Sequence, residues 1–132
     1  MKLVADTNIF LAVVLDEPAK AEIIRLTSGV EIVAPEVLPF ELGNALSALL
    51  KRSRLTPEAV LKAWDMIQLI PVELRNIDIR QALEIASQYQ IYAYDAYFLQ
   101  CALTLRTPLL TLDRRMMQVA QQLGVKTIEV AK

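Results

Sequence analysis

Four acidic residues stand where they could take part in chemistry: Asp6, Glu41, Asp95 and Asp113. The chain has no histidine, so it lacks the most common general base and the usual nitrogen ligand of zinc. Its single cysteine, Cys101, has Leu99, Ala102 and Leu103 nearby in the sequence and is predicted to be a buried small apolar residue. Catalysis would therefore depend on carboxylates, hydroxyls, lysine or a bound metal ion.

Two of these acids directly follow predicted buried strands. Asp6 comes after the apolar run 3–5, and Asp113 comes after the run 109–112. In open α/β sheets, ligands bind at the carboxyl ends of the strands. Each aspartate taken alone is more typical of a helix cap, so both interpretations stay open for each.

The other two acids are predicted to lie on helices. Glu41 shares a helical face with apolar residues such as Val37, Ala45 and Ala48, where an unpartnered carboxylate is costly to bury. It therefore needs a cation, a hydrogen-bond partner or an edge position open to water, and a salt bridge to a lysine or arginine is an equal alternative. Asp95 lies in the first turn of an apolar and aromatic helix, where the helix dipole favours an acid whatever its function.

The surrounding pattern alternates short apolar strands with helices. Since each parallel crossover needs a covering helix, this order predicts an α/β fold with a parallel sheet covered on both faces. A length of 132 residues is typical of one domain, and three glycines cannot form a glycine-rich phosphate loop. Strands are predicted at 2–5, 31–34, 71–74, 108–112 and 126–130, and helices at 9–15, 19–28, 36–52, 57–70, 79–89, 94–105 and 114–123.

Composition adds expectations about partners and location. The chain is 55% apolar with a mean hydropathy of +0.36, which predicts spare apolar surface for a second copy or another protein. The balance of 14 basic and 15 acidic residues argues against broad adhesion to nucleic acid. No apolar run approaches the ~20 residues that cross a bilayer, and no secretory leader is visible. We expect a cytoplasmic protein without a membrane segment.

Four segments carry a resemblance to a known family: residues 4–8 (Val-Ala-Asp-Thr-Asn), 40–46 (Phe-Glu-Leu-Gly-Asn-Ala-Leu), 94–98 (Tyr-Asp-Ala-Tyr-Phe) and 110–113 (Leu-Thr-Leu-Asp). In order and spacing they resemble the PIN domain, the small nuclease fold that includes the VapC-type toxins of type II toxin–antitoxin systems. The resemblance covers essentially the whole chain as a single domain, residues 1–132. It implies a three-layer fold with a five-stranded parallel sheet flanked by helices.

The same resemblance implies that the four acids meet in one site and are both the metal ligands and the catalytic residues. Asn8 and Thr111 match positions that sit beside the acids and are implied to support them. Clustered carboxylates repel one another and bind divalent cations, and hard oxygen ligands suit Mg²⁺ or Mn²⁺. Such ions could activate a water for attack on an RNA phosphodiester bond.

A protein of this kind is expected to be an endoribonuclease, the toxin of a toxin–antitoxin pair, which forms a homodimer and is inhibited by a small antitoxin protein. Candidate contacts to RNA phosphates are basic residues whose ordinary interpretation is that of solvated helix ends. These candidates are Arg114, Arg115, Lys51, Arg52 and Arg54.

Other functions remain to be weighed. A housekeeping RNA-processing nuclease of the same family, or a non-catalytic PIN-like binding module, would share the fold. A response-regulator receiver needs a phosphate-accepting aspartate after its third strand, and residues 71–76 contain none. The Asp-x-Asp pair of haloacid-dehalogenase-like phosphatases is also missing, because Asn8 stands two residues after Asp6.

Overall fold

Five parallel strands form the central sheet of the computed structural model, which describes residues 1–131. Their order across the sheet is β3-β2-β1-β4-β5. This confirms the predicted α/β fold with a five-stranded parallel sheet. The strands are β1 (Lys2–Ala5), β2 (Glu31–Pro35), β3 (Glu73–Arg75), β4 (Leu109–Leu110) and β5 (Thr127–Ile128).

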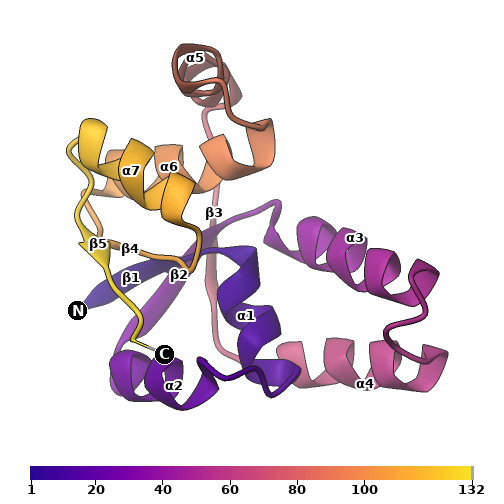
Figure 1. Ribbon diagram of the computed structural model, residues 1–132. Coiled ribbons are helices and arrows are strands. Elements are labelled where there is room, and N and C mark those ends of the chain that lie inside the picture. The colour runs from indigo at the N-terminus through magenta and orange to yellow at the C-terminus, as the bar shows by residue number, and fades with distance from the viewer. Residues whose placement is uncertain (132) are drawn as a thin grey trace.

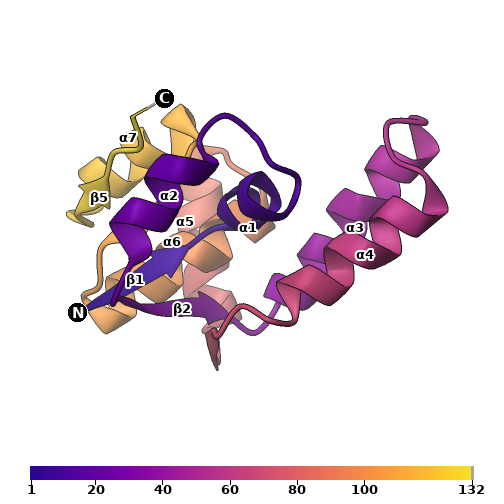
Figure 2. The same cartoon turned by 90° about the horizontal axis from the view of Figure 1, so that it is seen from below.

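Residues 1–131 contain seven helices, and helices cover the sheet on both faces, as parallel crossovers require (Figure 1). On one face α6 packs against β1 and β2, with α5 outside it and α7 beside it; α1 and α2 lie on the other face. The antiparallel pair α3 and α4 projects away from the sheet (Figure 2). The helices are α1 (Thr7–Val14), α2 (Lys20–Thr27), α3 (Leu38–Lys51), α4 (Pro57–Ile67), α5 (Ile79–Tyr89), α6 (Ala93–Leu105) and α7 (Arg114–Gln122).

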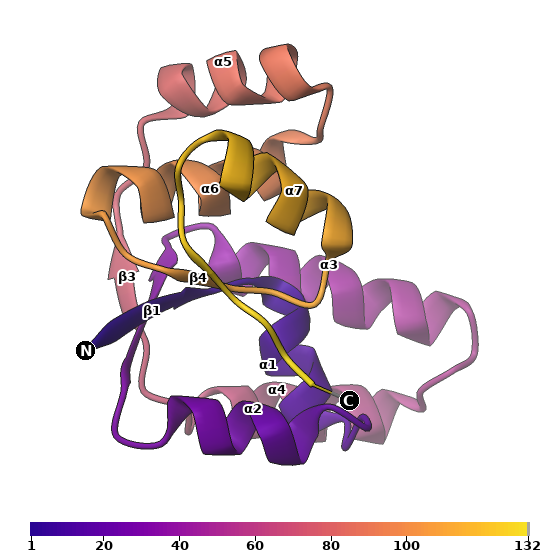
Figure 3. The same ribbon diagram turned by 60° about the vertical axis from the view of Figure 1, so that its left-hand side comes forward.

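The central strand β1 aligns the carboxyl ends of its neighbours. Val4 is in register with Val33 of β2 and with Leu109 of β4. The backbone N–H of Asp6 donates to the carbonyl of Leu110 at 3.3 Å, so the chain that leaves β1 stays beside the chain that leaves β4. Figure 3 shows α1 and α7 beginning at this same edge of the sheet.

Two expected helix starts have the predicted side-chain caps. Thr56 Oγ1 accepts from the backbone N–H of Ala59 at 3.1 Å, and Asp78 Oδ1 accepts from that of Gln81 at 3.0 Å. Cys101 is buried, as predicted. Among the helices of residues 1–131, none is long and apolar enough to cross a membrane.

The predicted core face of α3 needs correction. Its buried line consists of Leu38, Leu42 and Leu46, whereas Val37, Ala45 and Ala48 are only half-buried. These leucines repeat every four residues and so form one row along the helix. Glu41 therefore lies on the flank of the buried face and is half-buried, the edge position that a carboxylate can occupy.

Several predicted elements also differ from the observed ones in length or position. The predicted strands 108–112 and 126–130 each shrink to two paired residues, and the strand expected at 71–74 is shifted to Glu73–Arg75. The helix predicted at 36–52 begins two residues later, at Leu38. The backbone N–H of Glu36 still donates to the carbonyl of Arg75 in β3, so this residue is still held to the sheet.

Candidate active site

All four acids lie at the amino-terminal ends of helices. Asp6 is the N-cap of α1 and Asp113 is the N-cap of α7, while Glu41 and Asp95 lie in the first turns of α3 and α6. Three of these helices directly follow β1, β2 or β4, whose carboxyl ends share one edge of the parallel sheet. The fold thus supplies four acids from four separate elements.

Asp6 is the most deeply buried of the four, with 3% of its surface exposed. Its Oδ1 accepts from the backbone N–H of Ile9 at 3.4 Å, and its Oδ2 accepts from the hydroxyl of Thr111. The pKa of Asp6 is raised to about 7: burial is the largest cause, these two hydrogen bonds oppose it, and the negative charges of Asp113 and Glu41 add a smaller rise. The pKa stays high because burial outweighs the hydrogen bonds.

Thr111 connects two of the acids. Its hydroxyl donates to Asp6, and the same oxygen accepts from the backbone N–H of Asp113 at 3.0 Å. Asp113 Oδ1 accepts from the backbone N–H groups of Arg115 and Met116 at 2.8 and 3.1 Å. Within residues 1–131 its Oδ2 makes no hydrogen bond, so capping occupies only one of its two oxygens.

Glu41 and Asp95 complete a chain of electrostatic contacts. Burial raises the pKa of Glu41, the nearby Thr7 hydroxyl lowers it, and the charge of Asp95 raises it. Burial also raises the pKa of Asp95, and Asp113 adds to that rise. Repulsion therefore acts between Asp6 and Glu41, Glu41 and Asp95, Asp95 and Asp113, and Asp113 and Asp6, which closes a ring.

No positive charge neutralises this ring. In the part of the chain that the structure describes, none of the four acids forms an ion pair with lysine or arginine. Within the same part, no three acidic side chains are close enough to make a ready group of metal ligands. The four acids thus share an uncompensated negative field without forming a preassembled metal cage.

Within residues 1–131, two buried side-chain atoms at the site of the four acids have no hydrogen-bond partner: Thr7 Oγ1 and Glu41 Oε2. The Thr7 hydroxyl is close enough to lower the pKa of Glu41 in the way a hydrogen-bond donor does, but the two atoms do not reach full hydrogen-bond geometry. Leaving such a group unsatisfied costs about 1–3 kcal/mol. Oxygen donors in this state fit a hard divalent cation or its bound water. Sequence reasoning missed Thr7, although a β-branched hydroxyl residue directly after an acid was a usable signal.

The residues predicted to support the four acids differ in position. Thr111 contacts two of them, whereas Asn8 is exposed on α1. Arg114 and Arg115 are exposed and directly follow Asp113. Arg115 also donates from Nη2 to the carbonyl of Tyr89 at 2.8 Å, which ties the start of α7 to the end of α5.

The second predicted basic cluster lies far from the four acids. Lys51 ends α3, and residues 52–54 lie in the turn at the outer end of the α3–α4 pair (Figure 1). Ten residues of α3 separate Glu41 from Lys51, a distance of about 15 Å along the helix axis. This cluster could reach only a distant part of a long substrate.

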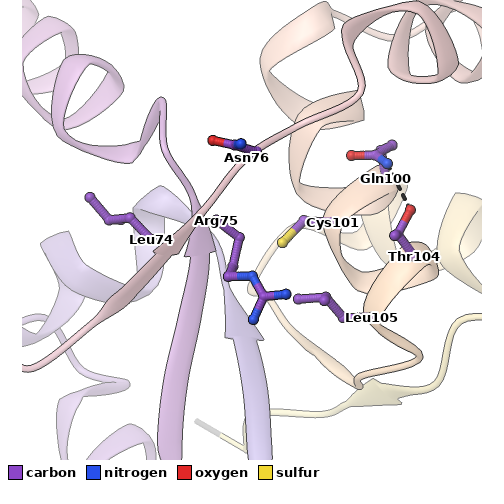
Figure 4. Close-up of a pocket in the computed structure, with 7 residues that line it drawn as sticks. All are labelled: Leu74, Arg75, Asn76, Gln100, Cys101, Thr104 and Leu105. Carbon is purple, nitrogen blue, oxygen red and sulfur yellow. Dashed lines mark hydrogen bonds between the residues drawn. The ribbon is translucent and has the colours of Figure 1, made fainter.

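A separate cavity of about 400 Å³ lies between β3 and α6 (Figure 4). Arg75 extends into it from the end of β3 and pairs with Glu73 Oε1 at 3.0 Å. The amide of Gln100 is already hydrogen-bonded to Gln81 and Thr104. No acid lines this cavity, so it is distinct from the site of the four acids. Its lining residues are Leu74, Arg75, Asn76, Gln100, Cys101, Thr104 and Leu105.

The fold and the site together define a parallel α/β domain with a carboxylate-rich edge suited to divalent cations. The chain belongs to the PIN domain family, whose model matches residues 3–122. PIN domains are generally nucleases.

Solved structures share this fold at low sequence identity. PAE2754 from Pyrobaculum aerophilum is 17% identical, with a TM-score of 0.72 over 96% of this chain and 83% of that chain. VapBC2 from Rickettsia felis bound to a DNA fragment from their promoter is 14% identical, with a TM-score of 0.71 over 99% of this chain and 100% of that chain. No curated protein matches the sequence.

Proposed function

We propose that this chain is a Mg²⁺- or Mn²⁺-dependent endoribonuclease whose four acids hold the ion and whose substrate is RNA. The observation that carries the proposal is the closed ring of repulsion among Asp6, Glu41, Asp95 and Asp113, without a basic partner in residues 1–131. Carboxylates that repel one another either take up protons or bind a divalent cation. Membership of a nuclease family favours the cation.

In this proposal a bound divalent ion supplies Lewis acidity and an activated water for phosphodiester hydrolysis. The chain's own residues orient the carboxylates. Thr111 and the N–H of Ile9 hold Asp6, and the start of α7 holds Asp113 through one oxygen and leaves the other free. Arg114, exposed beside Asp113, is the candidate contact to an RNA phosphate nearest the site.

We further infer that the chain acts in the cytoplasm as the toxin of a toxin–antitoxin pair, with a small antitoxin and a second copy of itself as partners. The similarity in fold to a chain of VapBC2 supports this inference. Large apolar side chains on the projecting helix pair also support it, because they would gain by being covered. Phe40 of α3 and Leu61 of α4 are 73% and 65% exposed, and Leu69, which follows α4, is 81% exposed.

Two alternatives remain. A housekeeping RNA-processing nuclease would use the same site without a cognate inhibitor. A non-catalytic binding module would keep the fold but not the chemistry, and the presence of all four acids favours an enzyme.

Inducible expression in a bacterial host, together with RNA cleavage by the purified protein, tests the proposal. Wild type is compared with Asp6→Asn and Asp95→Asn at matched protein levels, with Glu84→Gln on the exposed face of α5 as the control. We expect Mg²⁺-dependent cleavage and growth arrest from wild type and the control only. Cleavage without growth arrest would favour a processing enzyme. A wild-type protein that neither binds Mn²⁺ nor cleaves RNA would refute the proposed nuclease.

A further inference from the structure

The unpartnered hydroxyl of Thr7 is the starting point. Thr7 is 6% exposed, and its Oγ1 is buried without a hydrogen-bond partner. The other buried side-chain atom in this condition within residues 1–131 is Glu41 Oε2. The two residues come from α1 and α3, which pack against each other, so both unsatisfied atoms lie at one junction.

The position of Thr7 explains why its own helix does not satisfy the hydroxyl. A threonine inside a helix can donate to the carbonyl one turn back, as Thr27 does to Ile23 at 2.7 Å. Thr7 is the first residue of α1, and the residue four positions earlier, Leu3, belongs to β1. The hydroxyl is therefore free for a partner outside α1, and the buried, unpaired Oε2 of Glu41 is an acceptor in the same condition on the adjoining helix α3.

Thr111 shows how such a contact works in this molecule. Its buried hydroxyl donates to Asp6 Oδ2, while Asp6 Oδ1 accepts from the start of α1. The carboxylate of Asp6 is thereby fixed at both oxygens. Glu41 has no equivalent support, because one of its oxygens is buried and unpaired.

We propose that Thr7 is a positioning residue, whose hydroxyl donates to Glu41 Oε2 when a divalent cation is bound and so directs the other carboxylate oxygen toward the remaining three acids. This inference rests on the proposed metal-dependent function. Removing such a supporting hydrogen bond typically weakens metal binding about 10- to 100-fold.

Valine and serine separate positioning from packing. Valine has the shape of threonine but no hydroxyl, whereas serine keeps the hydroxyl and loses the methyl group. If the hydroxyl only filled space, valine would serve as well for metal binding. Thr27→Val on α2 is the matched control, because it removes a threonine hydroxyl that bonds only to its own helix.

Two measurements are needed: Mn²⁺ affinity from the electron paramagnetic resonance signal of free Mn²⁺, and urea unfolding of the metal-free protein. For Thr7→Val we expect Mn²⁺ affinity to fall about tenfold or more, with metal-free stability equal to or above wild type, because an unsatisfied hydroxyl is removed. Thr7→Ser and Thr27→Val are expected to bind Mn²⁺ like wild type.

Each other outcome has a defined meaning. If Thr7→Val binds Mn²⁺ as tightly as wild type, the positioning role is wrong while the proposed nuclease stands. If Thr7→Val loses stability together with affinity, or Thr7→Ser loses affinity equally, the role is packing and the inference fails. If wild type itself binds no Mn²⁺, the proposed function and this inference fail together.

Discussion

Replacing Asp6 by asparagine is expected to stabilise the metal-free protein at alkaline pH. Burial raises the pKa of Asp6 from 3.8 to about 7. Between these values the folded protein holds a proton that the unfolded chain has released. The free energy of unfolding therefore falls as pH rises through this window, and it stays at the lower level above it. An asparagine side chain at this position carries no charge, so the variant escapes this loss.

The size of the effect follows from the pKa. At 1.36 kcal/mol per pH unit, the difference between 3.8 and about 7 corresponds to roughly 4 kcal/mol. Asparagine can keep both local hydrogen bonds: its oxygen accepts from Ile9 N, and its amide donates to Thr111 Oγ1. The Thr111 hydroxyl can then turn to Met116 Sδ, 4.0 Å away. We therefore expect a gain of about 2–4 kcal/mol at alkaline pH and little gain near the unperturbed pKa.

Urea unfolding followed by circular dichroism, with a metal chelator present, measures this effect. Wild type and Asp6→Asn are compared at about pH 5 and about pH 8, with Asp65→Asn on the exposed side of α4 as the control. The stability difference between the first two proteins should grow with pH, and the control should follow wild type. If Asp6→Asn is destabilised equally at both pH values, the burial of Asp6 does not perturb its titration and the reasoning is refuted.

Three further predictions follow from the same contacts. Mg²⁺ or Mn²⁺ at about 100 times its dissociation constant should stabilise wild type by about 2.7 kcal/mol and Asp6→Asn far less, as calorimetry in matched buffers can measure. Asp113→Asn should keep the cap of α7 and lose RNA cleavage, whereas Asp113→Ala should also lose about 1 kcal/mol of stability; a destabilised asparagine variant would contradict the capping role. Leu99→Ala, at a fully buried position of α6, should cost about 2–5 kcal/mol in urea unfolding, and a near-neutral result would place it outside the core.

The elements with strong local signals were predictable from the sequence. The strand at 2–5 and the helix ending at Tyr89 match β1 and α5, because an apolar run and an Asp78 cap are local features. The length of β4, which lies next to the edge strand β5, is different. Leu109 and Leu110 of β4 pair with Thr127 and Ile128, the two residues of β5, and β4 ends where this pairing ends. The apolar run 109–112 does not reveal how far the pairing extends.

The site was predictable in its parts and less so in its arrangement. Acids after strands and in first helical turns can be read from the sequence, but which of them repel one another depends on the strand order. The face of Glu41 was misjudged because α3 has apolar residues on several sides. Thr7 escaped notice because a hydroxyl is unsatisfied only in relation to its surroundings.

The sequence left open whether each aspartate caps a helix or binds a metal ion. In the structure, capping does not exclude the second role. Asp6 and Asp113 do cap helices, and the other two acids lie in first turns. A helix terminus favours a carboxylate by about 0.3–1 kcal/mol, well below the roughly 4 kcal/mol that the raised pKa of Asp6 represents. Capping therefore orients the acids without neutralising them. In the proposed enzyme, the part of that energy that capping does not offset destabilises the metal-free protein and also favours cation binding. Variants that stabilise the metal-free protein by removing this charge should therefore weaken cation binding.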